Sequence, residues 1–313
     1  MSEPSRSKRR CLDMPWKPIV VGVDASPEAA DAAVFAVAVA HRAETSCHLV
    51  HATPGSGHAP RRDSYPYTRR YEQASVQVAA ALGDRVPAAV LKTLAVHRGK
   101  AAAVLNEAVA ALGAELVVLG GKHHSTLGRW LGGSTSVEVA RTALVPLLVA
   151  VGAPAIRRVL LALDPSAAAR PAAAAAERYA ALFGAELRAL SVVEPPAVVP
   201  EVPQQDTTDY YRRWEEALAR DVWPLIRAPG VGTVVRHGTA LETILREAAD
   251  WRADLVVVAS HGKGPVKRML VGSVTEGLIN HLPTSLLVVP GGVAPAGPDA
   301  SELITTVNHE EQT

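Results

Sequence analysis

The sequence predicts an α/β protein built from two tandem domains, each a five-stranded parallel sheet flanked by helices. Three observations support this prediction. Short, valine-rich apolar runs alternate with longer segments whose apolar residues recur at helical spacing. The same landmarks occur twice in the 313 residues, which is enough chain for two domains. Apolar residues make up 48% of the chain but aromatic residues only 4%, a composition that suits helices packed closely on a buried parallel sheet.

The repeat is defined by pairs of landmarks at a nearly constant offset. The pairs are Val20 and Leu160, Asp24 and Asp164, Gly99 and Gly238, Leu116 and Leu255, and Gly133 and Gly272. The offset is 140 residues for the first two pairs and 139 for the others, which is hard to obtain by chance. We therefore place the domains at residues 16–152 and 155–291, and expect residues 1–15 and 292–313 to be disordered tails.

Each element of the first copy follows from a local pattern. Apolar runs predict strands near residues 18–23, 47–52, 90–96, 115–120 and 146–151. Helical periodicity predicts helices near residues 27–44, 70–83, 101–113 and 133–143. Ser26 is the expected N-cap of the first helix, because Pro27 and Glu28 follow it.

The second copy repeats the same alternation. Its strands are expected near residues 157–163, 186–193, 232–236, 254–259 and 285–290. Its helices are expected near residues 167–183, 208–227, 240–251 and 273–282. The last strand of each copy is an apolar edge that needs covering, so we expect the two to pair antiparallel within the chain. Long loops at 54–70 and 194–207 follow the second strands; a mobile insertion is favoured over a ligand cover.

Charge and cysteine content narrow the function. The net charge of +1 gives no argument for a nucleic-acid or membrane partner. Cys11 and Cys47 lack Cys-x-x-Cys spacing, so neither a disulfide framework nor a metal site is expected. The polar, basic N-terminal stretch and the lack of a long apolar run predict a cytoplasmic protein.

The most informative motif follows the strand at 254–259. A loop containing Gly262 leads to Gly272 and Ser273, which open a helix. The free amides and the positive dipole end of that helix make a ready anion site. Gly133 and Ser134 repeat the arrangement in the first copy.

This spacing resembles the nucleotide-binding signature of the universal stress protein family: Gly-x-x-Gly, nine residues, then Gly-Ser/Thr. The resemblance covers about residues 17–151 and 156–290, and also rests on Val-Gly-Val-Asp-x-Ser at 21–26. The second copy has Ala259 in place of the first glycine. The first copy keeps Gly120 but has His123 in place of the middle glycine, which is the more damaging change.

The resemblance implies Rossmann-like domains with strand order 3-2-1-4-5. It also implies ATP, with or without Mg²⁺, at the carboxyl ends of the strands where that order reverses. In the family, an aspartate serves the ribose, a backbone group after the second strand reads adenine, and the glycine loop with its serine holds phosphates. The matching residues of the second copy are Asp164, Val192, Gly238, Gly262, Gly272, Ser273 and Thr275. Those of the first copy are Asp24, Ala52, Gly99, Gly120, Gly133, Ser134 and Ser136.

Each candidate has a plainer interpretation beside the functional one. The aspartates could be turn residues ahead of a helix, and the serines could be simple N-caps. The sequence has no P-loop, nucleophile elbow or interpretable acid/base pair, so we expect no enzyme, or at most slow ATP hydrolysis.

We therefore expect an ATP-binding regulatory protein of the stress response, with nucleotide mainly in the second copy. The expected partners are an adenine nucleotide, an unknown protein and a second copy of the chain in a homodimer. The alternative is a nucleotide-free interaction module of the same fold. An adenylate-forming enzyme ranks last, because residues 24–28 lack a His-x-x-His pattern.

Overall fold

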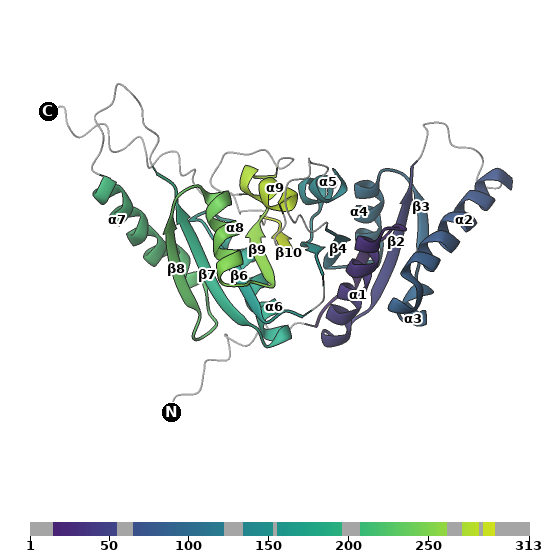
Figure 1. Cartoon of the computed structure of the whole chain (residues 1–313), viewed down its shortest axis with the longest axis horizontal. Helices are drawn as coiled ribbons and strands as arrows, with labels where there is room; N and C mark the ends of the chain where they lie inside the picture. The colour runs from purple at the N-terminus through teal and green to yellow at the C-terminus, as the bar shows by residue number, and fades with distance from the viewer. Residues whose placement is uncertain are drawn as a thin grey trace, which may run out of the picture.

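A computed structural model describes residues 15–54, 65–121, 134–152, 155–195, 207–261, 271–281 and 284–291 (Figure 1). The first half contains β1 (Ile19–Gly22), α1 (Pro27–Arg42), β2 (Cys47–Thr53), α2 (Tyr65–Leu82), α3 (Ala88–Leu91), β3 (Ala95–Arg98), α4 (Ala101–Leu112), β4 (Leu116–Gly120), α5 (Ser134–Thr142) and β5 (Leu147–Ala150). The second half contains β6 (Arg158–Ala162), α6 (Ala169–Phe183), β7 (Glu186–Val193), α7 (Thr207–Ala217), β8 (Gly232–His237), α8 (Ala240–Asp250), β9 (Leu255–Ala259), α9 (Ser273–Asn280) and β10 (Ser285–Val289).

All of these strands join one sheet in the order β3-β2-β1-β4-β5-β10-β9-β6-β7-β8. Within each half the neighbouring strands are parallel, and each half has the order 3-2-1-4-5 counted along its own chain. The two halves meet where β5 and β10 pair antiparallel, with Leu148 opposite Leu287. The predicted antiparallel junction is therefore confirmed. Because the strands reverse direction at this junction, the carboxyl ends of the two halves lie at opposite ends of the strands.

Helices cover both faces of the sheet (Figure 1). On one face α1, α2 and α6 pack over an apolar layer, and on the other α4, α5, α8 and α9 pack over a second layer. Alanines occupy the buried stripe of α1, at Ala29, Ala32, Ala33 and Ala36, which lets the helix approach the strands closely. Ser26 caps α1 as predicted: its hydroxyl oxygen accepts a hydrogen bond from the Ala29 amide at 3.2 Å.

Side chains join the halves on both faces of the junction. Arg141 of α5 forms an ion pair with Glu276 of α9 at 2.9 Å. On the opposite face Arg178 of α6 pairs with Glu115 at 3.0 Å. The guanidinium of Arg178 also lies 3.6 Å from the ring centroid of Trp16, a cation–π contact. Residues from both copies thus supply each interaction, which fixes one half against the other.

Several expected boundaries differ from the structure. The loop expected at 54–70 ends earlier, because α2 already begins at Tyr65. Residues 90–94 do not belong to the third strand, because Ala88–Leu91 form α3 and β3 begins at Ala95. The Thr93 hydroxyl donates to the Val90 carbonyl at 2.6 Å and accepts from the Leu49 amide at 3.1 Å, which anchors this turn on β2.

The helix expected at 208–227 is also interrupted. The regular part of α7 ends at Ala217, a π-helical turn spans Leu218–Val222, and a 3₁₀ turn follows. Pro224 has no amide hydrogen and its ring clashes with the carbonyl four residues earlier, so an α-helix cannot continue through it.

Cys47 is expected to resist thiol reagents in the folded protein. Its side chain is buried in the core at the start of β2, and burial raises the pKa of the thiol to about 12. With this pKa, almost none of the thiol is ionised at neutral pH. The thiolate is the form that reacts with thiol reagents. In a Cys11→Ser variant, we expect no reaction with a disulfide reagent at pH 8 and one full equivalent after unfolding in guanidinium chloride. Fast labelling of the native protein would contradict the burial of Cys47.

Candidate functional site

The strand order reverses at one point in each half. The strand β6 lies between β7 and β9. The next strand along the chain, β7, pairs on one side of β6, and the later strand β9 pairs on the other side. In the first half β1 lies between β2 and β4 in the same way. Ligands of open parallel sheets bind beyond the carboxyl ends of the strands at such a reversal. The two reversals lie at opposite ends of the strands, so a nucleotide crevice is expected at a separate place in each half.

An aspartate turn follows the central strand of each half. The Ser166 hydroxyl donates to Oδ1 of Asp164 at 2.7 Å. In the first half the amide of Ser26 donates to Oδ1 of Asp24 at 2.9 Å, and the hydroxyl of Ser26 donates to the same oxygen. Both aspartates therefore accept hydrogen bonds within a turn that precedes a helix, which is the non-functional role considered for them from the sequence. The described residues donate only to Oδ1, which leaves Oδ2 of each carboxylate to accept from a ligand hydroxyl.

The beginning of α9 supplies hydrogen-bond donors beside this turn. Gly272 is the N-cap, with extended backbone, and Ser273 is the first helical residue. The Gly272 amide donates to the Ser260 carbonyl at 2.8 Å, but the next amides at a helix start have no intrahelical acceptor. The Ser273 side chain is exposed, whereas Thr275 is buried and its hydroxyl donates to the Ala259 carbonyl at 2.9 Å. Thr275 thus fixes the helix against β9, while Ser273 remains accessible.

The loop between β9 and α9 has a fixed base. The Ser260 amide donates to the Val289 carbonyl at 2.8 Å, and its hydroxyl oxygen accepts from the Gly291 amide at 3.3 Å. Together with the bond from Gly272, these contacts hold both ends of the loop at the carboxyl end of β9. Gly262 and Gly133 lie outside the described residues, as does the side chain of Ser134. Ser136, the counterpart of Thr275, is buried in α5.

The glycines after the third strands have a conformational reason to be glycine. Gly99 has φ +146° and Gly238 has φ +136°, and residues that carry a Cβ rarely adopt such backbone angles. Each amide donates to the carbonyl at the end of the neighbouring second strand, Thr53 at 3.0 Å and Val193 at 3.1 Å. These bonds bring the end of the third strand beside the second strand in each half.

Ala52 and Val192 lie one residue before the ends of β2 and β7, and both are partly buried. Their backbone therefore reaches the same end of the sheet as the glycines after the third strands and the aspartate turns. In each half, the described candidates lie at or beside the carboxyl ends of neighbouring strands.

Gly120 is required by packing. A Cβ at this position would lie 2.4 Å from the backbone oxygen of Glu28, inside the first turn of α1. The second half has Ala259 at the matching position, and there the helix starts later. The helix α6 begins at Ala169 rather than at the predicted 167, two residues after the counterpart of Pro27.

Gly120→Ala is expected to destabilise the protein. The new methyl group meets backbone rather than a flexible side chain, so overpacking should lower the free energy of unfolding by about 1–3 kcal/mol. Gly291→Ala is the matched control, because a Cβ there meets the nearest atom at an ordinary 3.4 Å. Chemical denaturation of both variants measures the difference. If both variants had the same free energy of unfolding, the first turn of α1 would be able to move away from the new methyl group without loss of stability.

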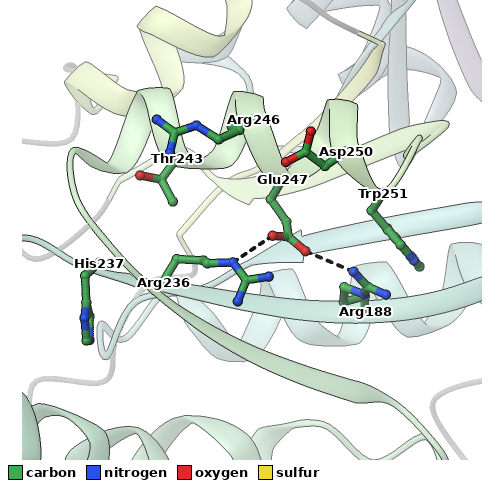
Figure 2. Close-up of a pocket in the computed structure, with 8 residues that line it drawn as sticks. All are labelled: Arg188, Arg236, His237, Thr243, Arg246, Glu247, Asp250 and Trp251. Atoms are coloured by element: carbon green, nitrogen blue, oxygen red, sulfur yellow. Dashed lines mark hydrogen bonds and ion pairs between the residues drawn. The ribbon is translucent and has the colours of Figure 1, made fainter.

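One cluster near the second site was missed by sequence reasoning. Arg188, Arg236 and Glu247 meet between β7, β8 and α8 (Figure 2). The sequence does contain one sign of this cluster. The two copies differ at its positions, where the first half has His48, His97 and Ala108.

The comparison with known sequences agrees with this architecture. The sequence model of the universal stress protein family matches residues 15–150 and 155–290. This chain belongs to the universal stress protein family. Each half corresponds to one family domain, and the expected family resemblance is confirmed.

Similar proteins match either nearly the whole chain or about half of it. A universal stress protein of Mycolicibacterium smegmatis is 29% identical over 301 residues, which cover 87% of this chain and 96% of that protein. A universal stress protein of Mycobacterium bovis is 33% identical over 178 residues, covering 53% of this chain and 59% of that protein. The crystal structure of a universal stress protein from Archaeoglobus fulgidus has a TM-score of 0.60 at 20% identity, covering 88% of this chain and 98% of that one. At that identity the likeness is one of fold.

None of the helices in the described part of the chain combines the length and the apolar character that crossing a bilayer requires. Among the same residues, no three His, Cys, Asp or Glu side chains gather closely enough to hold a metal ion.

Proposed function

We propose that this universal stress protein is a regulatory protein of the stress response that binds ATP, with or without Mg²⁺, mainly in its second half. The proposal is supported by the groups at the carboxyl end of β6, where a nucleotide crevice is expected. Asp164, with a carboxylate oxygen left to accept, follows the central strand, and the amides at the start of α9 follow its neighbour β9. A ribose hydroxyl suits the carboxylate, and phosphates suit the helix start.

The residues have separate roles in this proposal. Asp164 accepts from the ribose, and backbone near Val192 and Gly238 contacts the adenine end. Gly262, Gly272 and Ser273 surround the phosphates with amide and hydroxyl donors. Because His123 stands where Gly262 stands in the second half, the first site would bind less well. The candidates of the first half, from Asp24 to Ser136, remain predictions for this weaker site.

The proposal favours regulation over catalysis. Phosphoryl transfer needs a positioned base or metal ligands, and the sequence names neither in the crevice. We therefore propose slow ATP hydrolysis at most, with bound nucleotide controlling the shape or partner choice of the protein. A cytoplasmic location, an unnamed protein partner and a homodimer of tandem chains belong to the same proposal. Light scattering tests the dimer, since a single chain mass at micromolar concentration would remove it.

Mass spectrometry of freshly purified, denatured protein tests the function directly. We expect ATP or ADP to be released, and calorimetric titration of nucleotide-free protein to show binding of ATP but much weaker binding of GTP. If the protein releases no nucleotide and never binds adenine nucleotides, the proposal fails. A nucleotide-free interaction module then becomes the better description.

A further inference from the structure

A cavity of about 250 Å³ opens between α8 and the outer strands β7 and β8 of the second half (Figure 2). It is lined by Arg188, Arg236, His237, Thr243, Arg246, Glu247, Asp250 and Trp251. Most of these residues are charged, which is unusual for space under a helix that packs on a sheet. Cavities of this size and polarity hold water or a small polar ligand.

A buried carboxylate organises the cavity. The Glu247 side chain is only 6% exposed, and its two oxygens bind two different arginines. Nη1 of Arg188 lies 3.0 Å from Oε1, and Nε of Arg236 lies 3.0 Å from Oε2. The guanidinium of Arg188 also lies 4.3 Å from the ring centroid of Trp251. Both guanidinium groups are therefore held in place before any ligand arrives.

The arginines keep donors beyond those that Glu247 uses. A guanidinium has five N–H groups, and Glu247 accepts from one nitrogen of each arginine. Figure 2 shows the Arg236 and Arg188 side chains on the sheet side of the cavity and Arg246 along α8 on the other. Three arginines face two carboxylates, Glu247 and Asp250, so the lining carries one excess positive charge. These groups favour an anion in the cavity.

The ring of His237 does not add to this charge. It stacks on Tyr211 of α7, with centroids 4.3 Å apart, on the opposite side of β8. Figure 2 shows the ring pointing away from α8. The cation set of the cavity is therefore made of arginines.

The cluster belongs to the second half alone. At the positions of Arg188 and Arg236 the first half has histidines, and at the position of Glu247 it has Ala108. Trp251 is likewise matched by Leu112. Since the two halves share the fold, the cluster is not needed to form a domain of this kind. A difference in function between the halves accounts for it better than a structural requirement.

We propose that this cavity binds the phosphate group of a small molecule, at a site separate from the proposed nucleotide crevice. Arginine forks match phosphate oxygens well, because each guanidinium presents parallel N–H groups. A tetrahedral phosphate accepts hydrogen bonds from several directions. It could therefore accept from arginines on both sides of the cavity. The cavity lies under α8 and extends from Arg188, near the amino end of β7, to Arg236, which pairs with Val192 near the carboxyl ends, so only its outer end adjoins the nucleotide candidates.

Calorimetric titration of the full chain with inorganic phosphate at low ionic strength tests the site. We expect one phosphate per chain to bind, and Arg236→Gln to weaken its binding at least tenfold. Arg236 is half exposed, so this variant should fold. Arg85→Gln, which removes an arginine exposed to a similar degree that pairs with Asp31, is the matched control and should bind phosphate like the parent.

Saturating ATP separates this site from the nucleotide crevice. Phosphate binding should persist with ATP present. If the parent binds no phosphate, or if Arg236→Gln binds it like the parent, the proposed site does not exist. If ATP abolishes phosphate binding, the phosphate occupies the nucleotide crevice and the proposal is wrong, while the proposed function stands.

Discussion

Leu148→Ala is expected to lower the free energy of unfolding by about 2–5 kcal/mol, the usual cost of deleting a large buried aliphatic side chain. Leu148 is fully buried at the centre of β5. Its partner across the junction is Leu287 of β10, also fully buried and part of the same apolar layer. Removing either side chain leaves a cavity between the two halves, and urea unfolding followed by circular dichroism measures the loss.

The double variant tests whether the junction exists as described. Because Leu148 and Leu287 lie directly opposite, we expect their effects to be non-additive by about 0.5–3 kcal/mol. Leu148→Ala combined with Leu190→Ala is the control pair. Leu190 lies in β7 and in the other apolar layer, so these two effects should add. Additive effects for Leu148 and Leu287 would contradict the antiparallel pairing of the last strands.

The fold could be predicted from the sequence because its determinants are local or repeated. Valine-rich runs at 20–23 and 255–258 indicate buried strands by themselves, and the repeat offset assigns each strand its counterpart. The pairing of β5 with β10 followed from a single physical requirement, that an apolar edge be covered. The N-cap at Ser26 followed from its own residue and the proline after it.

The incorrect parts depend on contacts that local patterns do not contain. The turn at α3 is held by Thr93, which bonds to β2 more than forty residues earlier in the chain. The end of α7 is different, since Pro224 is visible in the sequence and should have ended the expected helix.

The candidate site could be predicted only in part. Spacing located Asp164, Gly238 and Gly272 at strand and helix ends, and the structure places all three at the same end of the second half. Spacing could not show that the Thr275 hydroxyl is committed to Ala259. It also could not find the arginine cavity, because Arg188 and Glu247 are far apart in the sequence and meet only across β7 and α8.

Gly262→Leu is expected to weaken ATP binding more than a hundredfold. The Ser260 carbonyl accepts from the Gly272 amide at 2.8 Å, which fixes the base of the loop beside the start of α9. Gly262 matches the middle glycine of the family signature, so the resemblance implies that its backbone contacts phosphate together with the helix amides and the Ser273 hydroxyl.

A leucine side chain at 262 should keep phosphate from the loop backbone. Each charge-assisted hydrogen bond lost costs roughly 1.5–3 kcal/mol, and tenfold in affinity corresponds to about 1.4 kcal/mol. Two lost bonds therefore exceed a hundredfold. His123→Leu is the matched variant in the first half, where the loop already carries a side chain, and it should change ATP binding little. Calorimetric titration of both variants decides between the halves: if Gly262→Leu binds ATP like the parent and His123→Leu does not, the nucleotide belongs to the first half.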